Sequence, residues 1–492
     1  MLGNFYQLTP TSILRITHSH LEVLVYESIK IPDKVSALDI EDEEDKAVGL
    51  EGLEIQLIEF LSTLITNAAE ITKNTEQKPL LEGDMKQLVW LLCIYAQIKK
   101  SDADQLMGKE HAAISDFIAL EADDASNISL RNCSQLLIEE LIRIDKVFTL
   151  ILAEVIDMFI SDKSKAIHAE PLPLPNFDYQ SFYYESSNSL RALFKREAAL
   201  YLFGWFAPNI NTDIEGADKI LVNTVKNYLL PELKTERKDY DNLFKYRAYS
   251  TGAQVLSVLA DTEYFEGISQ ELLEEAYKAL INPNTHLAVQ MGCCKVFKEA
   301  KSTLNKIEKK EVLEQLAKQL LVVLDNASTD TRIFVLKAMN VFCKSKFVDQ
   351  IYGLVGSLFE AALKTLVAAN SEAEIYNEVP YFAYTVFSQS KVVVASVVPI
   401  VCKFMSNLIT SYEYNEADND LIEIAYGIFR IAIEKVFNDN KEVSPEIQNT
   451  ISILIKEMMI RNDISFLLRA LNVLRHYLAY AFNTITHEYF IY

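Results

Sequence analysis

Glycine and proline are scarce in this chain, with 13 glycines and 12 prolines among 492 residues. An all-β fold needs many tight turns, and these two residue types supply the backbone conformations that such turns require. Alternating runs of Val, Thr and Ile bounded by Asn-Gly or Asp-Gly are also missing from the sequence. These absences argue against an all-β fold and favour helix through nearly the whole chain.

The sequence also lacks the short motifs of common catalytic and metal sites. Glycine-rich phosphate loops and the Gly-x-Ser-x-Gly nucleophile turn do not occur. None of the seven histidines forms His-Glu-x-x-His, and none of the six cysteines forms Cys-x-x-Cys, a pattern typical of buried thiols in a reducing compartment. We therefore expect no enzyme, no cofactor and no metal site. A site assembled from residues distant in the sequence is the alternative that motifs leave open.

A membrane span and a secretory signal are not indicated either. The longest apolar stretch, from Val392 to Ile409, contains Pro399 and Lys403. This interruption predicts a pair of buried helices rather than a segment that crosses a bilayer. The N-terminal residues show no basic region followed by an apolar core and a cleavage site. We expect a protein that is neither secreted nor inserted into a membrane.

Positive charge is in short supply, since 47 basic residues face 69 acidic ones and the net charge is −22. Such a chain repels phosphate, so direct nucleic-acid binding is not expected and basic proteins are the natural partners. Acidic residues are densest in a segment that we call the acidic run, which comprises Asp39, Glu41, Asp42, Glu43, Glu44 and Asp45. It is either a solvated inter-helix loop or a docking strip for Lys- and Arg-rich segments.

A second acidic patch comprises Glu121, Asp123 and Asp124. It precedes a helix start expected at Asn127, where acidic side chains favour the helix dipole, so a local role competes with partner binding. Short basic stretches, such as the one around Arg237, are expected on solvated helix faces.

What the chain does contain is a repeat of about 44 residues in its second half. Six segments carry it, and they align at Tyr246, Val289, Phe334, Tyr376, Leu421 and Ser465. Each segment is typical of a tight turn followed by a capped helix start, with Asn, Asp or Thr accepting hydrogen bonds from the first-turn amides before an apolar run. Apolar residues then recur every three or four positions, as in Leu287, Met291, Cys294 and Phe297.

One helix pair cannot bury both of its faces, so repeated pairs must stack. We predict an all-α fold, a HEAT-like helical-repeat solenoid built as a right-handed superhelical array of antiparallel helix pairs. The expected organisation is HEAT-like repeats over 1–165 with the acidic run in a loop at 39–45, and regular repeats over 191–492. Between them, Pro171-Leu-Pro-Leu-Pro175 and the aromatics that follow predict a linker or long loop over 166–190.

The first half also carries a family resemblance. Its motifs run in order through the acidic run, Leu50-Glu-Gly-Leu53, Gln87-Leu-Val-Trp90, Ile128-Ser-Leu130-Arg131 and Phe194-Lys-Arg-Glu197. Their order and spacing resemble the central part of an importin-β (karyopherin) superfamily receptor, most similar to the importin-9 branch. The resemblance covers roughly the first half of the chain, and the rest is similar only as HEAT-like repeats.

The resemblance implies a monomeric nuclear transport receptor that moves between cytoplasm and nucleus. It implies basic protein cargo, including core histones and ribosomal proteins, release linked to Ran bound to GTP, and contact with the Phe-Gly repeats of nuclear pores. Such receptors are about twice this length, and the repeats that usually contact Ran are not recognisable before Tyr6. The chain is thus either a fragment or a shortened homologue. A HEAT-type scaffold without a transport role is the alternative from another class.

Overall fold

The computed structural model describes residues 55–63, 89–122, 129–160, 190–209, 217–259, 266–300, 304, 309–369, 372–411 and 419–481, apart from positions 57, 61, 90, 91, 94, 99, 145, 146, 441 and 462. The acidic run, Asp123, Asp124 and residues 166–189 of the expected linker lie outside these ranges. The described part of the chain forms helices and no strand, as predicted. It divides into two compact units, with the main break after Ile268 and with Lys109–Asp116 assigned to the second unit.

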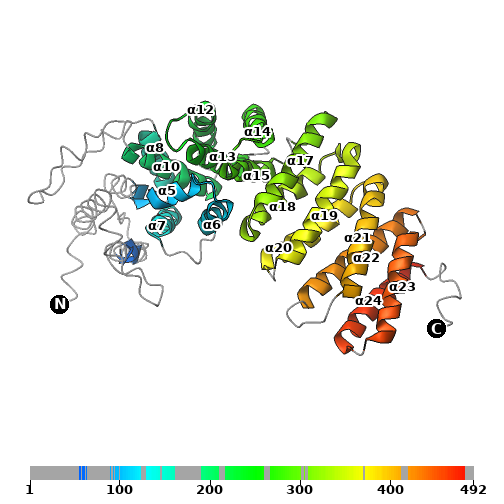
Figure 1. Ribbon diagram of the computed structural model, residues 1–492. Coiled ribbons are helices and arrows are strands. Elements are labelled where there is room, and N and C mark those ends of the chain that lie inside the picture. The colour runs from blue at the N-terminus through cyan, green and yellow to red at the C-terminus, as the bar shows by residue number, and fades with distance from the viewer. Residues whose placement is uncertain are drawn as a thin grey trace, which may run out of the picture. The chain divides into compact units, whose positions relative to one another are not determined.

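The second unit is a solenoid of two helix layers (Figure 1). One layer consists of α15 (Leu287–Glu299), α18 (Thr329–Cys343), α20 (Ala373–Phe387), α22 (Asn419–Asn440) and α24 (Ile464–Ala481), each packed on the next. The other consists of α17 (Lys310–Asn326), α19 (Tyr352–Ala368), α21 (Lys391–Ser411) and α23 (Pro445–Ile460). Each helix of the second layer also packs on the helix that follows it in the chain. This arrangement confirms the all-α helical-repeat solenoid.

The six predicted repeat segments lie at the starts of six helices, five of which form one layer of the second unit. Five of the six segments fall where α15, α18, α20, α22 and α24 begin, and the sixth falls at the start of α13 (Asp241–Leu259) in the first unit. The predicted capping holds at Asp463, whose Oδ1 accepts hydrogen bonds from the amides of Ser465 and Phe466. It is wrong at Thr285, because His286 is the capping residue of α15 and its Nδ1 accepts a hydrogen bond from the amide of Ala288. It is also wrong at Asp330, which lies inside α18, where Ser328 is the N-cap residue and its side chain makes no capping bond.

The helices at the centre of the described chain are more deeply enclosed than a single apolar stripe implies. All members of the predicted stripe on α15 are buried, and so are Ala288, Val289 and Cys293 between them. Both α13 and α15 therefore bury several faces, which is expected where a helix is flanked within its own layer and covered by the other layer.

The apolar stretch from Val392 to Ile409 forms one continuous helix, α21, rather than the predicted pair. Pro399 lies inside this helix. Two segments, Val348–Ala368 and Lys391–Thr410, are long and apolar enough to cross a membrane by length and composition, and half of each apolar window is buried. In the solenoid α21 packs against α19, α22 and α23, which accounts for its apolar character as a core helix.

The first unit positions the polar site described below. Its elements are α5 (Lys100–Leu106), the end of α6 (His111–Ala122), α7 (Leu130–Ile144), α8 (Val147–Ile160), α10 (Leu190–Phe206), α11 (Ala217–Thr224), a π-helical turn (Val225–Leu229), α12 (Leu230–Lys234) and α13. Helix α10 packs against α7, α8 and α13. At the α10–α13 crossing, a Cβ on Gly204 would lie 3.1 Å from Thr251 Oγ1 and 3.2 Å from its Cα. Only glycine allows this close approach without a shift.

Candidate functional site

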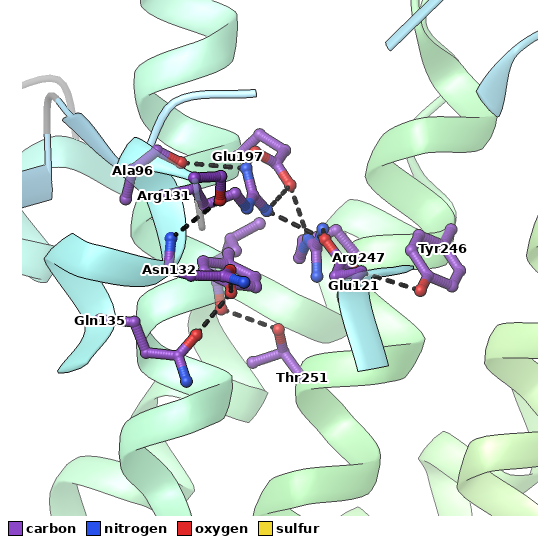
Figure 2. Close-up of polar contacts among 12 residues, drawn as sticks. Ala96, Glu121, Arg131, Asn132, Gln135, Glu197, Tyr246, Arg247 and Thr251 are labelled. Atoms are coloured by element: carbon purple, nitrogen blue, oxygen red, sulfur yellow. Dashed lines mark hydrogen bonds and ion pairs between the residues drawn. The ribbon is translucent and has the colours of Figure 1, made fainter. Parts of the chain in front are cut away.

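Four charged side chains meet inside the first unit, and we call them the ion-pair network (Figure 2). They are Glu121 at the end of α6, Arg131 on α7, Glu197 on α10 and Arg247 on α13. Their side chains are 8%, 13%, 0% and 4% exposed, so all four are largely withdrawn from water. Four helices thus contribute one charge each to a single buried cluster, with the consecutive helices α6 and α7 joined by the more distant α10 and α13.

The geometry is that of close, charge-assisted hydrogen bonds. Arg131 donates two parallel hydrogen bonds of 2.8 and 2.9 Å to the Glu197 carboxylate, and its Nη2 also donates to Glu121 at 3.2 Å. Arg247 donates from Nε to Glu197 at 2.6 Å and from Nη2 to Glu121. Each arginine therefore contacts both carboxylates, and the two positive and two negative charges balance within the network.

Aromatic and backbone groups complete the surroundings. The Tyr201 ring lies 3.7 Å from the Arg131 guanidinium carbon and 4.9 Å from that of Arg247, within cation–π range of both. Tyr246 donates its hydroxyl to Glu121 at 2.9 Å, and the Ala96 carbonyl accepts from Arg131 at 2.9 Å. These partners compensate the buried charges, as burial requires, although the Nε of Arg131 is buried without a hydrogen-bond partner among the described residues.

The neighbouring sequence explains why the helices can come this close. Ala198 and Ala199 follow Glu197 on α10, and Ala248 follows Arg247 on α13; all three are buried. Small side chains beside the charged ones let the helix backbones approach until the guanidinium and carboxylate groups meet.

The environment shifts the pKa values of the arginines and tyrosines. Burial alone lowers the pKa of Arg131 and Arg247, but the charges of Glu197 and Glu121 outweigh it and the net pKa of each is raised. Burial raises the pKa of Tyr201 and of Tyr246, and the Glu121 charge adds to the effect. These directions keep both arginines charged and both tyrosines neutral, and the network links α6, α7, α10 and α13 through their buried charges.

A smaller cluster lies next to it on Glu232, whose side chain is 1% exposed. Arg196 pairs with this carboxylate at 2.9 Å, and the Arg237 Nη2 donates to it at 2.8 Å. The hydrogen bond from Arg237 to Glu232 raises the pKa of Arg237. The expectation that Arg237 lies on a solvated helix face is wrong. It lies between α12 and α13, and its guanidinium also stacks 4.7 Å from the Phe244 ring.

Of the residues predicted to bind a partner, only Glu121 lies in the described part of the chain, and the structure places it in the ion-pair network. Its carboxylate is engaged by two arginines and a tyrosine inside the first unit. Sequence reasoning missed the network because its members are up to 126 positions apart. The available signal is a charge flanked directly by apolar or aromatic residues, as at Arg247 between Tyr246 and Ala248, but the partly exposed Lys245 on the same helix has the same kind of neighbours. Among the described residues no His, Cys, Asp and Glu cluster suits a metal ion.

The fold and the network together define a helical-repeat solenoid with a buried ionic core in its first unit. Among solved structures, the chain is similar to Lph2, a bidirectional nuclear transport receptor of S. cerevisiae, with a TM-score of 0.61 and 13% identity. The match covers 95% of this chain and 46% of that one. A structure of importin beta matches with a TM-score of 0.44 and 10% identity over 95% of this chain and 55% of that one.

At 13% identity the similarity to Lph2 establishes the fold alone. This chain spans less than half the length of that receptor. No protein-family model and no curated protein sequence matches the chain.

Proposed function

We propose that this chain acts as a nuclear transport receptor, or as a part of one, that binds basic protein cargo. The observation that carries the proposal is the solenoid, which follows the fold of a nuclear transport receptor over 95% of this chain. A stacked array of helix pairs presents an extended surface to a protein partner, which suits a carrier better than a catalyst. The resemblance of the first half to the importin-9 branch points in the same direction.

Charge supports the choice of cargo. The net charge of −22 and the acidic run favour Lys- and Arg-rich partners, of which core histones and ribosomal proteins are the proposed examples. Glu121 is engaged in the ion-pair network, so the proposal rests on the acidic run, with Asp123 and Asp124 as secondary contributors. Exposed ion pairs are screened beyond about 8 to 10 Å at physiological salt, and we expect binding to weaken steeply as salt rises.

The transport cycle is the finer part of the proposal. It comprises cargo release by Ran bound to GTP, contact with the Phe-Gly repeats of nuclear pores, and passage between cytoplasm and nucleus as a monomer. A HEAT-type scaffold would share the solenoid and the charge but would lack the response to Ran.

The test replaces every Asp and Glu of the acidic run with Asn or Gln and measures the Kd for core histones by fluorescence anisotropy at near-physiological salt. A matched control neutralises six exposed carboxylates of the second unit, namely Glu274, Glu311, Asp325, Glu360, Glu374 and Glu423. Both variants carry the same net charge. We expect the first to weaken binding at least tenfold, with an unchanged thermal transition, and the control to weaken it by much less.

Equal losses in the two variants would assign binding to overall charge and would remove the acidic run from the site. No histone binding by the unmodified chain would overturn the proposed cargo class. Histone binding that Ran bound to GTP leaves unchanged would favour the scaffold.

A further inference from the structure

The residue before α13 has a strained backbone. Tyr240 has a φ of 57°, and no other non-glycine residue in the described part of the chain has a positive φ. A bulky side chain rarely adopts this left-handed region, because its Cβ crowds the neighbouring carbonyl oxygen. Such a conformation persists only where the surrounding structure over-determines it, and residues of this kind cluster in parts that switch or clamp.

Three contacts hold Tyr240 in this conformation. Its hydroxyl donates a hydrogen bond of 2.8 Å to the Oδ1 of Asp104 on α5. Its ring meets the Phe194 ring of α10 edge-on, with the ring centres 5.3 Å apart. Its carbonyl accepts a hydrogen bond of 3.2 Å from the amide of Phe244 in the first turn of α13. Tyr240 thus links the start of α13 to both α5 and α10.

The loop before α13, residues 235–240, is anchored in its middle, and we call it the Tyr240 loop. The Arg237 amide donates to the Oδ1 of Asp241 at 2.9 Å, and the Arg237 guanidinium donates to the buried Glu232. Between this anchor and Tyr240, Lys238 and Asp239 are exposed. A change in the backbone of Tyr240 therefore acts first on this exposed part of the loop.

Helix α5 depends on contacts with the rest of the first unit. It has seven residues, too few for a helix to persist on its own in water. Ala103 and Leu106 are buried, while Asp104 is exposed. Ahead of α5, the Ala96 carbonyl accepts from Arg131 of the ion-pair network. The chain is therefore held by the network before α5 and by Tyr240 on α5 itself.

We propose that Tyr240 is a strained latch on α5. In the latched state its hydroxyl binds Asp104 and its φ is positive. When this bond breaks, Tyr240 relaxes to a negative φ, the Tyr240 loop shifts, and α5 opens as one unit. Opening exposes Ala103 and Leu106, while the ion-pair network stays closed. The latch is separate from the proposed transport function and does not depend on it.

The balance of forces makes opening accessible. The strain of Tyr240 opposes the contacts that hold it, so these contacts stabilise the latched state by less than they would around a relaxed residue. The bond to Asp104 lies at the surface, where water competes for both partners and the net gain of a hydrogen bond is small. A short helix with few buried side chains opens at a lower free energy than the core of its unit.

Amide hydrogen exchange of the full chain measures opening at α5. The amides of Met107 and Gly108 donate to carbonyls of α5, so their exchange reports whether this helix is folded. Tyr240→Phe removes the hydroxyl and keeps the ring, and we expect it to raise both exchange rates at least fivefold. The control Tyr277→Phe removes a hydroxyl bond of 2.6 Å to Gln315 in the second unit and should leave these rates unchanged.

The hydroxyl and the carboxylate should act as one unit. Asp104→Ala should raise the same two exchange rates. Adding Tyr240→Phe to Asp104→Ala should raise them no further, because both changes remove the same bond. Amides in the middle of α13, followed in the same samples, should keep their rates, which separates local opening from a loss of stability of the whole unit.

Limited proteolysis tests the strain. Trypsin cleaves after Arg237 or Lys238 when the Tyr240 loop is released, and mass spectrometry identifies these cuts. We expect Tyr240→Phe to be cut there at least threefold faster than Tyr240→Asn, because asparagine adopts a positive φ more readily and retains less strain. Loss of contacts alone predicts the opposite order, since asparagine lacks the ring as well as the phenolic hydroxyl.

Three results would overturn the latch. One is unchanged exchange at Met107 and Gly108 in Tyr240→Phe. Another is faster exchange that the middle of α13 shares, since Tyr240 would then stabilise the unit as a whole. The third is faster cleavage of Tyr240→Asn than of Tyr240→Phe, which would remove the strain from the account. Circular dichroism checks that every variant keeps its helix content.

Discussion

Replacing Arg247 with Met removes one positive charge from the ion-pair network while keeping the length of the apolar stem. Glu121 and Glu197, 8% and 0% exposed, would then share the single positive charge of Arg131. A buried ion pair that loses one partner leaves an uncompensated charge, which costs about 3–5 kcal/mol of unfolding free energy. We expect Arg247→Met to lower the stability of the first unit by that amount.

The assay is urea denaturation followed by tryptophan fluorescence, because Trp205 lies on α10 and its ring is 6.4 Å from that of Tyr201. The matched control is Lys245→Met on the same helix, which breaks a 2.6 Å pair with Asp241 whose side chains are each 25% exposed. Partly exposed pairs of this kind contribute about 0–1 kcal/mol.

Restoring neutrality should recover stability. Adding Glu121→Gln to Arg247→Met removes the unpaired negative charge, so the double variant should lose less than the two single losses summed, by about 0.5–3 kcal/mol. Equal losses for Arg247→Met and Lys245→Met, or simple additivity in the double variant, would refute the view that charge balance holds this network together.

Two further substitutions and one labelling experiment test different parts of the structure. Gly204→Ala should destabilise the first unit by about 1–3 kcal/mol in urea titration, because the new methyl group would press on Thr251. Burial raises the pKa of Tyr246 in the folded chain above the value near 10 of the unfolded chain. The stability that the neutral Tyr246 hydroxyl contributes is therefore present below about pH 10 and is lost as the pH rises further. Tyr246→Phe should reduce this alkaline loss of stability by up to about 1.4 kcal/mol per pH unit, measured in thermal melts between about pH 9 and 11. Five of the six cysteines are buried, and burial raises the pKa of the Cys294 thiol to about 12 and that of the Cys402 thiol to about 11. Ellman's reagent should therefore label the thiols of the native chain slowly and label all six cysteines after unfolding. Fast labelling of several native thiols would contradict that packing.

The solenoid could be predicted because its signals are local. A polar residue before an apolar run marks each helix start, and the return of that pattern from Tyr246 to Ser465 identifies one helix of every pair. The pattern failed where a different side chain made the same bond, as with His286 in place of Thr285. It also failed on Val392 to Ile409, since proline does not always end a helix that is packed on both sides.

The ion-pair network could not be predicted in the same way. Glu121 was singled out as one of several acidic residues, but its partners Arg131 and Arg247 come from other helices, and only the tertiary fold brings them together. The exposed stripe of α24, which includes Leu468 and Leu471, was equally hidden. The same helix carries a second apolar stripe with Phe466, Ala470 and Val473, and the sequence does not show which of the two stripes the solenoid buries.

The proposed transport function is tested most directly by loading the chain with core histones and adding Ran. The chain, immobilised at near-physiological salt, is saturated with histones and washed with Ran bound to non-hydrolysable GTP or to GDP. A transport receptor that releases basic cargo through Ran should lose its histones with the GTP form and keep them with the GDP form. Retention in both washes, or failure to capture histones at all, would contradict that function.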